Sequence, residues 1–125
     1  MSMLQNCGCG CSVSPKAIFS CSGAADVGEL TDRVARSLMK AGNGKMFCLA
    51  GIGGNVSGII KSTEAAPKIL VIDGCGLNCT KKTLEAGGFT EVIHLNLMDL
   101  GFTKGATDVD DQNINKVVEH ISTIF

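Results

Sequence analysis

The segment Lys68-Ile69-Leu70-Val71-Ile72-Asp73-Gly74-Cys75 joins a continuous aliphatic run to an abrupt polar turn. Residues 69–72 are all aliphatic and rich in Ile and Val, which is typical of a strand covered on both faces. Asp and Gly are turn formers, so the strand should stop as the chain reaches them. We therefore predict a buried strand over residues 68–72 that leads into a loop bearing Cys75.

Similar apolar runs lie on both sides of this segment, and they alternate with stretches that have the spacing of an amphipathic helix. The predicted strands cover residues 16–21, 46–50, 68–72 and 90–97, and the predicted helices cover residues 26–41, 56–65, 78–86 and 108–124. Such alternation requires right-handed crossovers and a parallel sheet covered on both faces. The prediction is an α/β fold, a small three-layer αβα domain with a mostly parallel four-stranded sheet in the order 2-1-3-4.

Local signals suggest how the predicted helices begin. Asp26 followed by Glu29 is a plausible capping pair for the first helix, and Asn55 is the expected cap of the second. Negative charge at Asp108 and the residues after it suits the start of the last helix. Residues 99–107 are expected to form a loop.

Length and composition restrict the function classes. The 125 residues suffice for one domain, which we place at residues 16–125 behind a Cys-rich arm at residues 1–15. The net charge is −1 and there is no Lys/Arg run, so nothing indicates a nucleic-acid partner. No apolar run reaches the roughly 20 residues of a membrane span, and no secretory signal is visible. The expected location is the cytoplasm.

Cysteine is the informative residue type, because there are seven and a reducing cytosol disfavours structural disulfides. Cys21, Cys48 and Cys75 all fall near the carboxyl ends of predicted strands, the edge at which open α/β sheets bind ligands. Cys79 lies four residues after Cys75, at a helix start that favours thiolate. We predict that these four thiolates form one metal site. Zinc suits such a set, and so does an iron–sulfur cluster.

Other interpretations of the same cysteines remain open. Cys75 and Cys79 can form a redox pair with Cys21 or Cys48 as the resolving thiol, although such pairs usually have two intervening residues rather than three. The cysteines can also be ordinary buried thiols. No catalytic residue is identified, so the sequence leaves open whether the protein is an enzyme.

Further residues near the predicted edge have two interpretations each. The Gly-rich residues 51–54 can bring N–H groups close to a small anionic ligand above the metal, but they lack a complete nucleotide-binding pattern. Asp73 is expected to bond its own loop or to orient a metal ligand. His94 and His120 are expected in core or surface positions, not as ligands.

The arm has its own alternation of cysteines. Cys7, Cys9 and Cys11 would face one side of an extended segment and could bind a soft metal ion such as Cu(I) or zinc. The alternative is an unordered tail.

Three stretches together resemble a known family. They are Phe19-Ser20-Cys21-Ser22-Gly23, Met46-Phe47-Cys48-Leu49-Ala50-Gly51-Ile52-Gly53-Gly54 and Ile72-Asp73-Gly74-Cys75. In this order they resemble the DGC-domain family, whose members are proposed to bind zinc, over residues 17–100. The resemblance implies a four-cysteine zinc site that matches Cys21, Cys48, Cys75 and Cys79, and it implies no established reaction.

Overall fold

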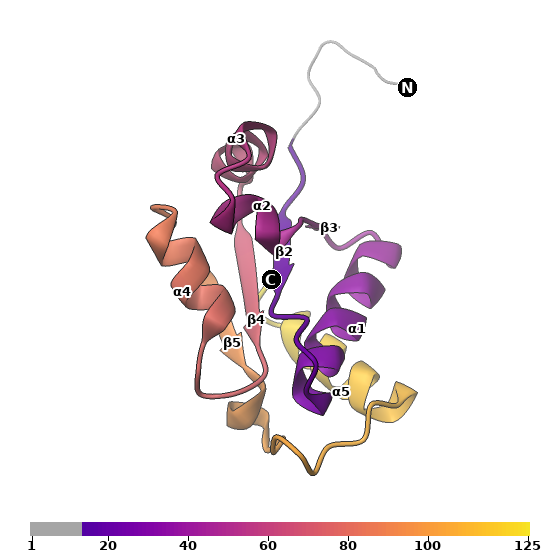
Figure 1. Cartoon of the computed structure of the whole chain (residues 1–125). Coiled ribbons are helices and arrows are strands. Elements are labelled where there is room, and N and C mark those ends of the chain that lie inside the picture. Colours follow the sequence, from indigo (N-terminus) through magenta and orange to yellow (C-terminus); the bar gives the residue numbers. More distant parts are fainter. Residues whose placement is uncertain (1–13) are drawn as a thin grey trace.

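Residues 14–125 are described by a computed structural model, in which a four-stranded parallel sheet lies between two layers of helices (Figure 1). The strands are β2 (Ala17–Ser20), β3 (Lys45–Met46), β4 (Ile69–Asp73) and β5 (Ile93–Asn96). The helices are α1 (Asp26–Lys40), α2 (Leu49–Gly53), α3 (Ser57–Ala65), α4 (Cys79–Ala86) and α5 (Asp111–Ile121), with a short 3-10 helix η1 (Leu97–Leu100) after β5.

The strand order is β3-β2-β4-β5, which confirms the predicted order 2-1-3-4. All neighbouring pairs are parallel, and β2 and β4 occupy the centre. The pairing of β2 with β4 continues past the strand end, since the Cys21 N–H donates to the Ile72 carbonyl at 3.2 Å. The carboxyl ends of these two strands therefore lie side by side.

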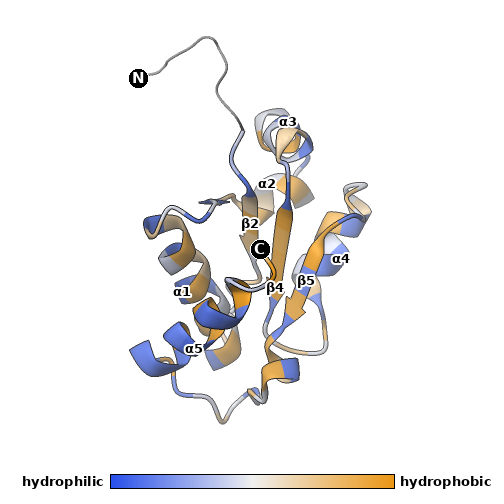
Figure 2. Ribbon diagram, turned by 180° about the vertical axis from the view of Figure 1, so that it is seen from behind, coloured by the Kyte–Doolittle hydropathy of each residue, from blue (hydrophilic) through white to orange (hydrophobic). Residues whose placement is uncertain are grey.

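Side chains of the central strands alternate between two apolar layers, as the pleat of a strand requires. Ile18, Leu70 and Ile72 pack with α1 and α5, whereas Phe19 and Val71 pack on the opposite face with α2 and α4. Figure 2 shows the largely hydrophobic strands between helices that carry both hydrophilic and hydrophobic residues. The predicted three-layer αβα arrangement is confirmed.

The predicted strand over residues 46–50 is wrong in extent. β3 covers only Lys45–Met46, and the apolar residues that follow turn into helix α2. The rings of Phe47 and Phe19 pack edge to face, with their centroids 5.8 Å apart, and Ile52 is buried in the same apolar layer. A short apolar run fits a strand or a buried helix equally well, and here packing on the sheet face selects the helix.

Two predicted caps are also wrong. The Asp26 carboxylate accepts hydrogen bonds from the N–H groups of Gly105 and Thr107 and of its own neighbour Val27, while the Glu29 side chain pairs with an arginine on α1. Asn55 has φ 56°, in the left-handed region that Asn tolerates, and it precedes α3 without capping it. Local sequence patterns did not reveal that a loop distant in sequence donates hydrogen bonds to the Asp26 carboxylate.

Gly74 lets the β4–α4 loop lie directly on the first turn of α1. A Cβ atom at Gly74 would come within 2.8 Å of the Val27 carbonyl group. A Cβ at Gly28 would meet the Gly23 backbone at 2.7 Å, so the β2–α1 loop is pressed against the same turn. These two contacts bring together the loops that carry Cys21 and Cys75.

No helix in the part of the chain that the structure describes is long and apolar enough to cross a membrane.

Gly74→Ala should lower the free energy of unfolding by about 1–3 kcal/mol, because the added methyl group has no room against α1. Urea unfolding followed by circular dichroism measures the change. Gly58→Ala is the matched control, since a Cβ at that position in α3 meets nothing within 4 Å. Equal stability of the Gly74→Ala protein and the wild type would contradict the close packing.

The hydrogen bonds from Gly105 and Thr107 lower the pKa of Asp26. This stabilisation is therefore complete above the ordinary carboxyl pKa of about 3.9 and is lost as pH falls through the lowered value. Asp26→Asn should reduce the fall in urea midpoint that accompanies acidification below about pH 4. The same acid-induced fall in Asp26→Asn as in the wild type would contradict the contribution of these hydrogen bonds.

Candidate functional site

The four predicted ligands Cys21, Cys48, Cys75 and Cys79 carry free thiols and lie on three different segments. Cys21 directly follows β2, and Cys75 lies in the loop after β4. Cys79 is the first residue of α4, and Cys48 immediately precedes α2. The chain leaves β2 and β4 toward opposite sides of the sheet, and ligands bind at such a reversal of strand order.

Three of the thiols line one hollow of about 350 Å³ between the β2–α1 and β4–α4 loops. We call it the cysteine hollow and define it by Cys21, Cys75 and Cys79. Lys104 and Leu77 also line it. The hollow therefore combines three soft sulfur donors with one cation that can offset the charge of thiolates.

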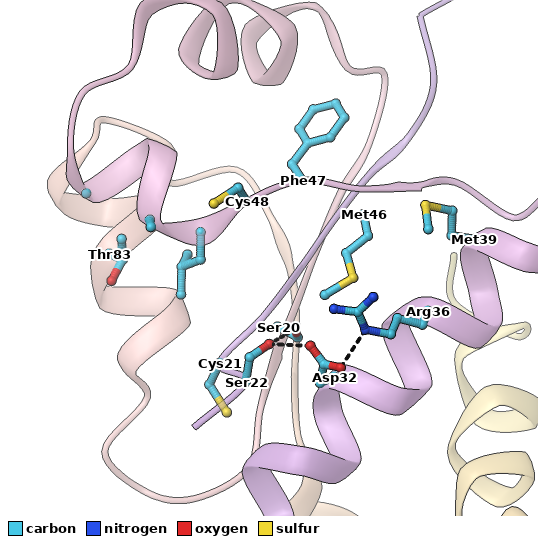
Figure 3. Close-up of a pocket in the computed structure, with 13 residues that line it drawn as sticks. Ser20, Cys21, Ser22, Asp32, Arg36, Met39, Met46, Phe47, Cys48 and Thr83 are labelled. Atoms are coloured by element: carbon cyan, nitrogen blue, oxygen red, sulfur yellow. Dashed lines mark hydrogen bonds and ion pairs between the residues drawn. The ribbon is translucent and has the colours of Figure 1, made fainter. Parts of the chain in front are cut away.

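Cys48 lines a second hollow of about 780 Å³ on the β3 side of β2 (Figure 3). We call it the arginine hollow, because Arg36 of α1 lines it too. Cys21 belongs to both hollows and is the residue that links them. Figure 3 shows Cys48 above Cys21 on the left of the arginine hollow, with their sulfurs not directed toward each other.

Within residues 14–125, no three Cys, His, Asp or Glu side chains are grouped closely enough to hold one metal ion. The donor chemistry fits a thiophilic ion, because four thiols border two adjoining hollows at one edge of the sheet. The spacing does not yet fit, because even Cys21, Cys75 and Cys79 are not grouped closely enough for one ion, and Cys48 lines the other hollow. Binding by all four requires the surrounding loops to close.

The Cys21 thiol is held by Thr31 of α1. Its Sγ lies 3.3 Å from the Thr31 Oγ1, which also accepts the Ser22 N–H at 3.3 Å. Thr31 gives its single hydroxyl proton to the Gly28 carbonyl at 2.7 Å. Cys21 is therefore the donor to Thr31 in this arrangement, and a thiolate at Cys21 would draw the Thr31 proton toward itself.

Asp73 organises the loop that carries Cys75. It is 1% exposed, and its two carboxylate oxygens accept the N–H groups of Thr80 at 2.8 Å and Lys81 at 3.1 Å. The second oxygen also lies 2.9 Å from the His94 Nε2. Asp73 thus bonds nearby backbone as expected, but its partners lie in the first turn of α4 rather than in its own loop, where the carboxylate satisfies two free N–H groups.

The loop between Cys75 and Cys79 has a second anchor in Asn96, at the end of β5. The Asn96 Nδ2 donates to the Cys75 carbonyl and to the Asn78 Oδ1, both at 2.8 Å. Asn78 itself has φ 53°, in the left-handed region. Hydrogen bonds from β5 thus fix the backbone between the two cysteines.

The two histidines and the Gly-rich residues 51–54 lie in or beside defined elements of the fold. His94 pairs with Asp73 and His120 is exposed on α5, as core or surface placement predicts. The expected Gly-rich loop at residues 51–54 is largely helical, and the N–H groups of Gly51 and Gly54 are used in turns of the helix. Cys7, Cys9 and Cys11 lie outside the described residues.

Polar residues of α1 were missed at the sequence level. Thr31, Asp32 and Arg36 all face the cysteine-bearing edge, and Arg36 pairs with Asp32 at 2.7 Å. The spacing of four between Asp32 and Arg36 was a visible signal of an ion pair on one helix face. That the pair faces β3 required the packing of α1 on the sheet.

Comparisons with known proteins extend the resemblance. The DGC domain family model matches residues 17–121, so the likeness continues through α5. The anaerobic and virulence modulator AnvM of Pseudomonas aeruginosa is 33% identical over 87 residues, which are 70% of this chain and 66% of that protein. The chain thus spans just under two thirds of the relative's length. No solved structure shows a significant match.

Exposure predicts the order in which the thiols react. In reduced, metal-free protein, iodoacetamide should modify Cys48 and Cys79 before Cys21 and Cys75, because the first pair is exposed and the second is half-buried. Peptide mass spectrometry at timed intervals assigns each site and separates the arm cysteines. Faster modification of Cys21 than of Cys48 would contradict this arrangement of the loops.

Proposed function

The chain belongs to the DGC domain family, and from that membership we propose that it binds one thiophilic metal ion, zinc in the first instance, through Cys21, Cys48, Cys75 and Cys79. The observation that carries the proposal is the position of Cys21, which lines both hollows and so connects Cys48 to the other two thiols. Four thiolates are a suitable closed set for tetrahedral zinc.

Loop closure around the ion is the step that this chain must perform. The β4–α4 loop is anchored through Asn96 and Asp73, so Cys75 and Cys79 form the better fixed pair. Cys48 lies in the short link between β3 and α2. Because no three of the four thiols are grouped for one ion, both Cys48 and Cys21 have to approach the pair. Lys104 beside the cysteine hollow can offset part of the negative charge that four thiolates leave on a divalent ion.

A regulatory role suits this arrangement better than a catalytic one. The relative AnvM is named as a modulator, and ion-dependent closure would change the exposed surface of two loops at once. In this proposal, a partner protein recognises whether the four-cysteine site holds a metal ion or is empty.

A thiol redox function is the second candidate, favoured by the shared hollow of Cys21, Cys75 and Cys79. Cys75 and Cys79 would form a disulfide by losing two protons and two electrons to a partner disulfide, which becomes a dithiol. The half-buried Cys21 would then attack this disulfide, which transfers the bond to Cys21 and releases Cys75 or Cys79 as a thiol.

Metal content tests the leading proposal. The full chain, purified without air, should contain about one zinc per chain, and Cys48→Ser and Cys75→Ser should each lose most of it, because a site with three thiolates binds more weakly. Elemental analysis measures the metal. Cys9→Ser is the matched control and should keep its zinc.

Three outcomes would reject the four-thiolate zinc site. Retention of zinc in Cys48→Ser would remove Cys48 from the ligand set. Iron with sulfide would indicate a cluster for electron transfer. Absence of metal, with Cys75 and Cys79 cycling reversibly between thiol and disulfide, would establish the redox candidate.

A further inference from the structure

The arginine hollow has features that a metal site does not use. Its volume of about 780 Å³ lies within the range of roughly 300–1,000 Å³ found for small-molecule sites. Met39, Met46 and Phe47 supply apolar walls, and Arg36 is the cation among its lining residues. Small-molecule sites commonly combine apolar walls with a few fixed polar groups.

A chain of hydrogen bonds holds Arg36 in place. The Arg36 Nε donates to the Asp32 Oδ2 at 2.7 Å, and the Ser22 hydroxyl donates to the Asp32 Oδ1 at 2.9 Å. The Ser20 Oγ lies 2.6 Å from the Ser22 Oγ. Since Ser22 gives its only proton to Asp32, Ser20 must be the donor to Ser22. The charge pair on α1 is thus connected to the end of β2.

Both serines are unusual at their positions. Ser20 is 3% exposed and ends a strand whose other residues are apolar, and its buried hydroxyl bonds to the exposed Ser22. Ser22 has φ 52°, a left-handed conformation that costs a residue other than glycine of order 1 kcal/mol or more. Strain of this kind clusters at binding and catalytic sites. Here it directs the Ser22 hydroxyl toward Asp32.

This arrangement leaves the terminal nitrogens of Arg36 for a ligand. Among the described residues, only its Nε has a hydrogen-bond partner. Figure 3 shows the guanidinium reaching from α1 into the hollow. A guanidinium that is bonded through its Nε still presents the N–H groups of its two terminal nitrogens, and these can pair with the two oxygens of a carboxylate. Because Asp32 pre-orients the group, less conformational entropy is lost on binding.

We propose that the arginine hollow binds a small organic carboxylate. The acid group pairs with the terminal nitrogens of Arg36, and the apolar body packs against Met39, Met46 and Phe47. This inference goes beyond metal binding and does not depend on it, since Arg36 is not among the proposed metal ligands. Cys21 and Cys48 also line the hollow, so an occupant would lie beside both thiols.

Methionine methyl groups provide the readout. The full chain, reduced and treated with chelator, is labelled with ¹³C-methyl methionine and titrated with phenylacetate and with its neutral counterpart phenylacetamide. Saturable shifts are expected at Met39 and Met46 but not at Met98, which lies outside the hollow and is exposed. Phenylacetate should bind on the order of ten-fold more tightly than phenylacetamide, because only the acid forms charge-assisted bonds.

Two arginines on α1 give a matched pair of variants. Arg36→Gln should weaken phenylacetate binding about ten-fold and abolish the preference over phenylacetamide. Arg33→Gln removes the same charge and a similar helical ion pair, with Glu29 at 3.1 Å, but does not touch the hollow. It should bind phenylacetate like the wild type. If Arg36→Gln does not fold, Arg36→Lys keeps the charge and should still weaken binding, because it loses the paired donors.

Several results would overturn the proposal. They are equal affinity for acid and amide, equal weakening by the two Gln substitutions, or no saturable shift of Met39 and Met46 at about 10 mM phenylacetate. Because the titration uses metal-free protein, its failure says nothing about the zinc site. Conversely, a chain without zinc can still show this binding.

Discussion

The parallel pairing of β2 with β4 is the interaction on which the functional edge depends. It places two buried strands at the centre of the sheet and continues through the hydrogen bond between Cys21 and Ile72. The chain then turns to opposite faces, so two loops leave the same edge and enclose a space between them. Gly74 and Gly28 let both loops lie against the first turn of α1. Without these close approaches, Cys21 and Cys75 would not border one hollow.

Different polar groups at this edge support the cysteine hollow and the arginine hollow. Asp73 accepts buried N–H groups at the start of α4, and Asn96 donates to the Cys75 carbonyl. Leaving a buried hydrogen-bonding group without its partner typically costs about 1–3 kcal/mol. On the other side of β2, hydrogen bonds through Ser20 and Ser22 connect the end of the strand to the Asp32–Arg36 pair. Cys21 stands between the two spaces and is bonded to Thr31. A change at Cys21, whether metal binding or oxidation, therefore reaches both hollows.

Sequence patterns predicted the fold well where burial alone decides structure. The aliphatic residues of 69–72 form β4, and the apolar stripe of the last segment forms α5 against α1. The sequence patterns gave a wrong prediction at residues 46–50, because a short apolar run has no periodicity that distinguishes a strand from a helix. They also failed at Asp26, whose hydrogen-bond partners lie about 80 residues away in sequence. Both failures concern contacts that local sequence does not contain.

The sequence by itself determined the alternation of strands and helices and the presence of four cysteines near one edge of the sheet. Hydrophobic periodicity and the handedness of crossovers are sufficient for these features. Only the tertiary structure decided that Cys48 faces a different hollow from Cys75 and Cys79, and that Arg36 shares that hollow. Hydrogen bonds and metal bonds require atoms to be placed within a few tenths of an ångström, and that precision comes from loop packing against α1, not from spacing along the chain.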